Sequence, residues 1–149
     1  MPRPAKNPKA TLTFVLVGIG IAVLVAVPFF KIVKAKADET IARRNLRILG
    51  GALQDYTQDY DGKLPPLQDD TSFRNAMESY VPNMKDHSDP FVDPAANAPF
   101  VLNSKLSFKE VSKLEDSTTS TVATQNKPME RHVLTLFADG HVENVPADR

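Results

Sequence analysis

Cysteine is absent from the 149-residue chain, so the protein forms no disulfide bond and has no thiolate for catalysis or metal binding. A chain without thiols tolerates an oxidising compartment without requiring one. Three motifs of common enzyme sites are also missing: the Gly-x-Ser-x-Gly elbow, the phosphate-binding Walker loop and the zinc motif His-Glu-x-x-His. We therefore expect a protein that is not an enzyme.

Net charge is absent as well, because 18 basic side chains balance 18 acidic ones, but the two signs are unevenly distributed. Residues 1–60 carry nine Lys or Arg against four Asp or Glu, whereas residues 61–149 carry nine against fourteen. An acidic distal part argues against nucleic acid as a partner. We expect neither a nucleic acid nor a small-molecule substrate to bind.

Charged side chains are missing from residues 11–30, which read TLTFVLVGIGIAVLVAVPFF. As a helix this stretch is roughly 30 Å long, the thickness of the hydrocarbon core of a bilayer. Basic residues bracket it, after a basic tail at residues 1–10. The stretch predicts a transmembrane helix whose partner is the lipid bilayer, and the expected anchor residues are Thr11, Phe14, Leu16, Ile21, Leu24, Pro28 and Phe30.

The apolar stretch continues into an amphipathic helix over residues 31–61. Apolar residues recur there in steps of four and three, which places them on one face of a helix. Gly50-Gly51 marks a close backbone approach or a slight bend, and Asp61-Gly62 is a suitable stop. The expected packing face consists of Leu46, Leu49, Leu53, Tyr56 and Tyr60.

Residues 62–149 predict a small α+β head. A short helical stripe starts near residue 70, and strands are expected at residues 100–102, 105–108 and 118–124. The strongest signal is a terminal hairpin, 132–138 and 141–145, around the turn residues Asp139 and Gly140. A two-residue loop there pairs Phe137 with Val142. The expected fold class is α+β, with a long N-terminal helix packed on a small antiparallel β-sheet.

Several of these segments together resemble the type IV pilin-like and type II secretion pseudopilin proteins. The resemblance is closer to the prepilin-type C-terminal domain named for a histidine, nine residues and Asp-Gly. It rests on the apolar helix, on NLRILGGALQDYTQDYDGKLPP at residues 45–66, on Asp89-Pro90 and Asp93-Pro94, on Leu102-Asn103-Ser104, and on LFADGHV at residues 136–142. These matches cover residues 11–146.

The chain departs from the family pattern at two places. Pilin precursors have a glycine before the cleavage point and a glutamate shortly after it, and neither is present in the corresponding stretch KATLTFV at residues 9–15. Six residues rather than nine separate His132 from Asp139. Cleavage by a prepilin peptidase and polymerisation therefore both stay open.

The resemblance implies a structural membrane protein of a type II secretion or type IV pilus-like assembly, with other pilin-like subunits or secretion components as partners. It also implies a single-pass protein of the bacterial inner membrane with a periplasmic C-terminal head. The six basic residues after the apolar stretch, against three before it, predict a cytoplasmic head instead. We favour the periplasm, because Asp38 and Glu39 lie among those six.

The weak metal candidates are His132, Asp139 and His141, which are close together in sequence. Calcium is conceivable, but it prefers six to eight oxygen ligands, and zinc needs a further ligand that the spacing does not supply. Turn geometry alone explains Asp-Gly, with His141 solvated. We therefore expect no cofactor and no catalytic residue.

Two alternatives stay open. Ala35-Lys36-Ala37 fits the small-x-small rule of signal peptidases, so the chain is also compatible with an exported soluble protein released after Ala37. The second alternative is a membrane-anchored binding protein that does not polymerise.

Overall fold

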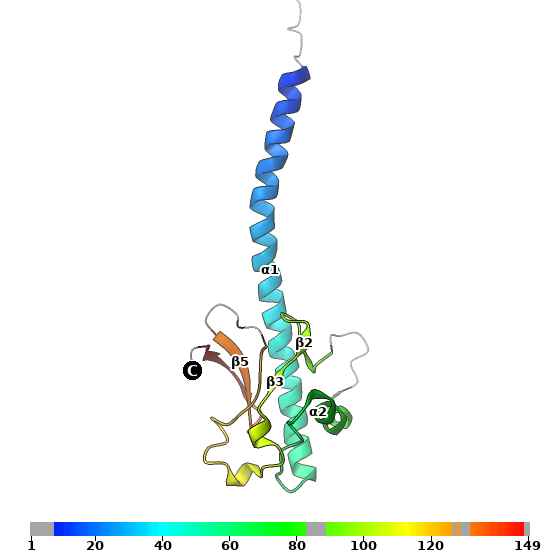
Figure 1. Cartoon of the computed structure of the whole chain (residues 1–149), viewed down its shortest axis with the longest axis vertical. Coiled ribbons are helices and arrows are strands. Elements are labelled where there is room, and N and C mark those ends of the chain that lie inside the picture. The colour runs from blue at the N-terminus through cyan, green and yellow to red at the C-terminus, as the bar shows by residue number, and fades with distance from the viewer. Residues whose placement is uncertain (1–7, 83–88, 127, 129–131, 148–149) are drawn as a thin grey trace, which may run out of the picture. The chain divides into compact units, whose positions relative to one another are not determined.

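A computed structural model describes residues 8–82, 89–126, 128 and 132–147, and within the first helix it describes side chains from residue 26 onward except residue 28. The chain divides into two compact units, residues 1–36 and residues 37–149, and we call the second unit the head. Helix α1, Pro8–Asp59, contains residues of both units (Figure 1). The head has the α+β composition expected from the sequence.

The head follows α1 with short elements. They are α2 (Asp70–Met77), η1 (Glu78–Tyr80), β1 (Val92–Asp93), β2 (Ala98–Pro99), β3 (Val101–Leu102), η2 (Ser104–Leu106), η3 (Val111–Lys113), β4 (Thr121–Thr124), β5 (His132–Phe137) and β6 (Val142–Pro146). Strands β1 and β2 form a small antiparallel pair, and the other four form an antiparallel sheet in the order β3-β4-β5-β6. In Figure 1, α2 and the β5–β6 hairpin lie on opposite sides of α1.

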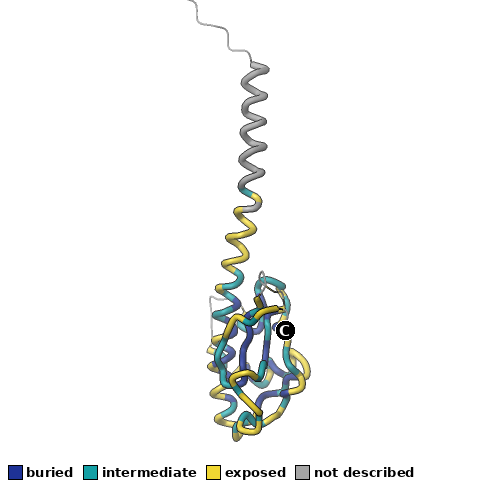
Figure 2. The backbone as a smooth tube through the Cα atoms, turned by 90° about the vertical axis from the view of Figure 1, so that its left-hand side faces the viewer, coloured by how far each residue is buried: buried dark blue, intermediate teal, exposed yellow. Residues whose placement is uncertain are grey.

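One face of α1 is the spine of the hydrophobic core. Leu46, Leu49 and Leu53 are at most 1% exposed, and they pack with Leu134 and Leu136 of β5 in one buried cluster. In Figure 2, the buried segments, in dark blue, lie in the interior of the head. Burial of each leucine stabilises the head by about 1.5–3 kcal/mol, so this face fixes the helix on the sheet.

The C-terminal end of α1 has two left-handed residues rather than the single glycine that the sequence suggests. Asp61 has φ 52° and Gly62 has φ 77°. The N–H of Gly62 donates to the carbonyl of Thr57 at 2.7 Å, which is the 6→1 bond of a Schellman motif. Aspartate tolerates the left-handed conformation better than most residues, so the helix stops one turn before Pro65-Pro66.

Residues 105–108 do not form the strand that their sequence predicts. Instead, Ser104–Leu106 form η2, a single 3₁₀ turn. The side chain of Asn103 explains the difference, because its Oδ1 accepts from Lys105 N at 3.3 Å while its Nδ2 donates to Thr121 O at 2.9 Å. These two bonds turn the chain immediately after β3.

The terminal hairpin is present, but the predicted pairing of Phe137 with Val142 is wrong by one residue. Val142 pairs with Leu136, and Asn144 pairs with Leu134. The N–H of Gly140 donates to Phe137 O, and the N–H of Phe137 donates to His141 O, each at 3.0 Å. The loop therefore has three residues, with Gly140 left-handed at φ 88°, and a one-residue shift exchanges the faces of the paired strand.

Candidate functional site

Most of the predicted membrane anchor lies outside the residues whose side chains are described. This applies to Thr11, Phe14, Leu16, Ile21, Leu24 and Pro28, whereas Phe30 is described and is 70% exposed. Within the part of the chain that the structure describes, no helix is long and apolar enough to cross a membrane.

The described end of the apolar stretch is an exposed hydrophobic surface. Its large side chains are 48–70% exposed to solvent, and the members are Val27, Phe29, Phe30, Ile32 and Val33. The rings of Phe29 and Phe30 meet edge to face, with their centroids 6.5 Å apart. These large apolar side chains, close together in sequence and turned to solvent, form an exposed hydrophobic patch that calls for an explanation.

The predicted packing face of α1 ends in a tyrosine cluster. Tyr56 is 6% exposed and Tyr60 is 50% exposed, so Tyr60 lies at the edge of the core. The two rings stack with centroids 4.2 Å apart, and Tyr80 meets Tyr56 edge to face at 5.5 Å. Tyr80 donates its hydroxyl to Asp59 at 2.8 Å, and this hydrogen bond, with burial second, raises the pKa of Tyr80 to about 12.

Two glycines join α1 to the hairpin turn. A Cβ placed on Gly50 would approach the carbonyl oxygen of Gly140 to less than 3.0 Å, and a Cβ on Gly140 would lie 2.9 Å from the carbonyl oxygen of Gly50. Gln54 closes the contact by donating its Nε2 to the carbonyl of Asp139 at 2.8 Å. The turn residues Asp139 and Gly140 therefore serve to dock the hairpin on the helix.

The three metal candidates do not come together. His132 begins β5 and Asp139 follows its end, so about 20 Å of extended strand separates them. The Nδ1 of His141 lies 2.5 Å from Asp139 Oδ1, and the ring of His141 stacks on Phe137 with centroids 4.4 Å apart. No group of three or more His, Cys, Asp or Glu that could hold a metal ion occurs among the described residues.

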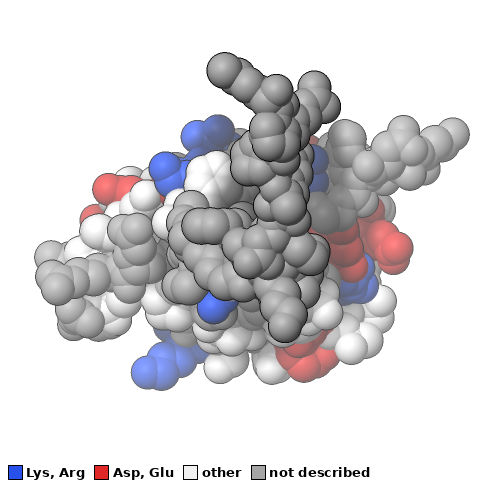
Figure 3. Space-filling model, turned by 90° about the horizontal axis from the view of Figure 1, so that it is seen from above, with Lys and Arg blue, Asp and Glu red and all other residues white. Residues whose placement is uncertain are grey.

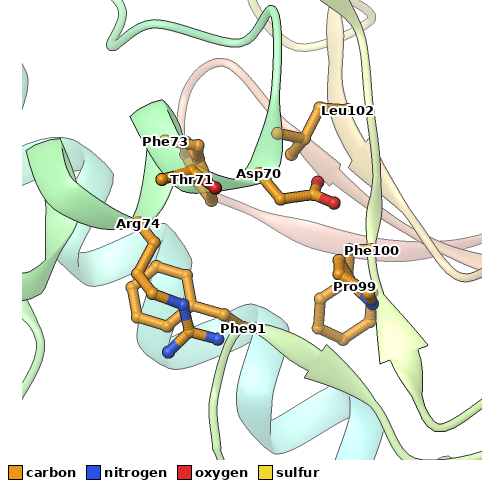
Figure 4. Close-up of a pocket in the computed structure, with 8 residues that line it drawn as sticks. All are labelled: Asp70, Thr71, Phe73, Arg74, Phe91, Pro99, Phe100 and Leu102. Carbon is orange, nitrogen blue, oxygen red and sulfur yellow. The ribbon is translucent and has the colours of Figure 1, made fainter.

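Sequence reasoning missed a hollow between α2 and the β1–β2 pair. Its cavity has a volume of about 340 Å³, and Figure 4 shows side chains from four segments around it. Phe73, Phe91 and Phe100 supply the apolar wall, and Asp70 points into the cavity from the first turn of α2. The aromatic residues are far apart in sequence, so only their hydrophobicity indicated that they were core residues.

An ion pair and a buried amide hold the wall of this hollow. Arg74 donates to both carboxylate oxygens of Asp89, at 2.6 and 3.2 Å, and its guanidinium lies 4.4 Å from the ring centroid of Phe91. Burial raises the pKa of Asp89, but hydrogen bonds from Arg74 and from Phe91 N outweigh it, so the net pKa is lowered. Asn45, fully buried on α1, donates to the carbonyls of Asp89 and Val92, both at 3.1 Å.

A second hollow of about 380 Å³ adjoins the first and shares Asp70, Phe100 and Leu102 with it. Asp69 lies on its rim and caps α2 by accepting from Ser72 N at 2.8 Å. Hydrogen bonds from the N–H and hydroxyl of Ser72 hold the pKa of Asp69 below its ordinary value. We call the two hollows together the aromatic groove. Because Asp89 neutralises Arg74, Asp69 and Asp70 leave its rim negative.

The outer face of the sheet carries a different, hydroxyl-rich hollow. It has a volume of about 530 Å³, and its lining comes from β4, β5, β6 and the preceding turn. Threonines at 118, 119, 121, 124 and 135 supply its hydroxyl groups, and apolar residues, among them Val133, Phe137 and Val145, complete the lining. Seen from above in Figure 3, on a different face from this hollow, the basic and acidic side chains of the described residues are interspersed.

The exposed apolar residues of α1 suit a lipid or helical partner, and the aromatic groove suits an apolar side chain next to a cation. No known protein family, curated protein sequence or solved structure matches this chain.

Proposed function

We propose that this chain is a membrane-anchored, pilin-like structural subunit with a small non-catalytic head. The observation that carries the proposal is the row of exposed side chains at Val27, Phe29, Phe30, Ile32 and Val33. In sequence, these residues end and follow the uncharged stretch at 11–30. Transfer of such a surface from water into the hydrocarbon of a bilayer is favourable by about 1.5–3 kcal/mol for each large side chain.

The residues that follow support a position at the membrane surface. Lys31, Lys34 and Lys36 are exposed and alternate with the apolar side chains of Ile32 and Val33. Lysine side chains at a helix end place their ammonium groups among headgroups while their methylene groups stay in the apolar layer. The proposed location is the bacterial inner membrane, with one helix in the bilayer and the head in the periplasm.

The proposed assembly is of the type II secretion or type IV pilus kind, with other pilin-like subunits as partners. Support comes from the α+β head, in which an N-terminal helix is the spine and an antiparallel sheet covers it. The head serves as a rigid body that presents surfaces to neighbouring subunits. Under this proposal the head catalyses no reaction, and the tasks of the chain are anchoring and contact.

A specific observation also favours the rival, export after cleavage. The boundary between the two compact units falls between Lys36 and Ala37, next to the candidate cleavage site after Ala37. The core residues begin only at Ala42, so cleavage there would release the head with its core complete. The mass of the mature protein distinguishes the membrane anchor from export, since an intact N-terminus supports the anchor and a start at Asp38 supports export.

Charge introduced into the apolar stretch tests the anchor. Ile21→Lys with Leu24→Lys should release the full-length protein from membranes washed with alkaline carbonate, because each charge at the centre of a bilayer costs about 2.5–3.5 kcal/mol. Gln58→Lys, on the exposed part of α1 in the head, is the matched control and should stay with the membrane. Retention of the double variant, or release of the unmodified protein, refutes anchoring.

The position of the head is a separate measurement. Alkaline phosphatase fused after residue 149 should be active, because that enzyme folds only outside the cytoplasm, whereas a fused green fluorescent protein should stay dark when exported unfolded. The opposite pattern would place the head in the cytoplasm, as the basic residues after the apolar stretch suggest.

A further inference from the structure

Phe108 is both exposed and held in an unfavourable backbone conformation. Its side chain is 57% exposed, and its φ is 58°, in the left-handed region that bulky residues rarely adopt. An exposed aromatic side chain contributes little to the core, and a smaller residue would fit this φ with less strain. Strain of this kind, at a position that the fold does not require to be aromatic, points to a role outside the fold.

Hydrogen bonds on both sides fix the backbone around Phe108. The N–H of Leu64 donates to Lys109 O at 2.8 Å, and the N–H of Val111 donates to Gly62 O at 2.8 Å. The N–H of Phe108 itself points to Pro65 O at 3.5 Å. The ring is therefore presented on a clamped turn and not on a mobile loop.

Lysines surround this turn in an otherwise acidic half of the chain. Lys63, Lys105, Lys109 and Lys113 lie in the two clamped segments, residues 61–65 and 104–113, and are all exposed. The acids of these segments are Asp61 and Glu110, and Glu110 pairs with Lys113 at 2.6 Å. Residues 61–149 carry fourteen acids and nine bases in total, and four of the bases but only two of the acids lie in these two segments.

We propose that Phe108 and its lysines dock into the aromatic groove of a second copy of this chain. The proposal rests on the proposed function, since it supplies a head-to-head contact for the assembly. Phe108 is the apolar projection, and Lys105 and Lys109 flank it in sequence. The groove offers the matching features: an apolar wall with a negative rim at Asp69 and Asp70.

The dimensions and chemistry of the two surfaces agree. A cavity of about 340 Å³ is within the range of about 300–1,000 Å³ in which proteins bind compact ligands, and it accepts a phenyl ring. A ring that enters meets Phe91 and Phe100, and edge-to-face contacts favour such aromatic pairs. The lysines then come to rest near the carboxylates of the rim, where opposite charges fix the orientation.

The two surfaces belong to different parts of the head, so the contact is heterologous unless a two-fold axis makes it reciprocal. Phe108 follows η2, whereas the groove lies between α2 and the β1–β2 pair. A heterologous contact adds one copy after another and gives rings or open filaments. This behaviour is what a subunit of an extended assembly needs.

A zero-length cross-linking experiment tests the contact in the full chain. Isotopically labelled and unlabelled protein are reconstituted together in phospholipid vesicles and treated with a carbodiimide, which joins ammonium and carboxylate groups in direct contact. Mass spectrometry should find Lys105 or Lys109 joined to Asp70 in peptide pairs with one labelled and one unlabelled partner. Such mixed pairs form only between copies, whereas pairs of a single label alone would overturn the proposal.

Variants separate docking from folding. Phe108→Ser should reduce the mixed pairs at least about tenfold, as expected for a buried aromatic at the centre of an interface. Its melting temperature should be equal or higher, because the substitution removes an exposed ring from a strained position. Tyr60→Ser, which also removes an exposed aromatic residue, is the matched control and should leave the mixed pairs unchanged. Equal cross-linking in Phe108→Ser refutes the docking.

Exchange of the charges gives the decisive result. Protein in which every copy carries Asp70→Lys should give no cross-links at residue 70. Mixing it with a Lys105→Glu, Lys109→Glu copy should give a new cross-link, with the charges reversed, between position 70 of the first copy and position 105 or 109 of the second. Absence of this new cross-link overturns the charge pairing. If the protein stays in carbonate-washed membranes while no mixed pairs form, only the docking is refuted and the anchor stands.

Discussion

The contact of α1 with the hairpin turn gives a quantitative prediction, because two adjacent glycines have opposite surroundings. Gly50 is buried, and a methyl group there would meet the carbonyl oxygen of Gly140 at less than 3.0 Å, its carbonyl carbon at 3.2 Å and Leu136 Cδ1 at 3.2 Å. Gly51 is exposed, and a methyl group there would meet nothing within 4 Å. Alanine at the two positions therefore has the same effect on the helix but a different effect on packing.

The magnitudes follow from that difference. Alanine in place of a glycine inside a helix stabilises it by about 0.5–1 kcal/mol, so Gly51→Ala should raise the free energy of unfolding by that amount. Gly50→Ala gains the same helix stabilisation, but its methyl group pushes the helix away from the rigid backbone of the turn, which costs about 1–3 kcal/mol. We expect Gly50→Ala to be the less stable of the two by about 1–3 kcal/mol.

Tyrosine fluorescence measures this difference in the intact protein. The chain has three tyrosines and no tryptophan, and all three tyrosines form the cluster at the end of α1. Thermal unfolding of the two variants in mild detergent should show Gly50→Ala melting several degrees below Gly51→Ala. Equal melting temperatures, or the reverse order, would mean that the helix and the turn do not touch as described.

Two further predictions concern buried and hydrogen-bonded polar groups. Asn45→Ala should destabilise the head by about 2–4 kcal/mol in urea unfolding, because it leaves the carbonyls of Asp89 and Val92 without their donor inside the core, whereas Gln58→Ala on the exposed face should have no effect. Asp59→Asn should lower the pKa of Tyr80 from about 12 toward its ordinary value of 10, measured by tyrosinate absorbance. Because the folded-state pKa of Tyr80 is the higher one, its stabilising contribution should be complete below about pH 10 and lost as the pH rises through about 12.

The spine of the head was predictable from sequence because helical spacing is a local property. Leu46, Leu49 and Leu53 recur in steps of three and four, and all three are buried. The hairpin was predictable in position but not in register. Asp-Gly fits a two-residue turn with both residues left-handed, and it also fits a three-residue loop with glycine alone left-handed. Of the two turn residues, Gly140 has a positive φ and Asp139 does not, so the loop has the three-residue geometry.

The aromatic groove was not predictable, because its parts come together only in the folded head. Phe73 lies on α2, whereas Phe91 directly precedes β1 and Phe100 lies between β2 and β3, and no single periodic pattern relates the three. The strand expected at residues 105–108 would include Phe108, but the structure has a 3₁₀ turn at Ser104–Leu106 instead. The side chain of Asn103 redirects the backbone, because it forms hydrogen bonds with both the next turn and a neighbouring strand. Residue propensities do not predict such hydrogen bonds.

The order in which the head's core is synthesised has a consequence for its folding. Helix α1 is made before the rest of the head, whereas β5 and β6, which cover its leucines, follow all the other elements of the head. Contacts of such long sequence separation form slowly, so the apolar face of the nascent helix stays exposed until the hairpin has been synthesised. A copy truncated before the hairpin leaves this apolar face uncovered and is readily degraded by proteases. The hairpin, residues 132–146, thus decides whether each newly made copy survives.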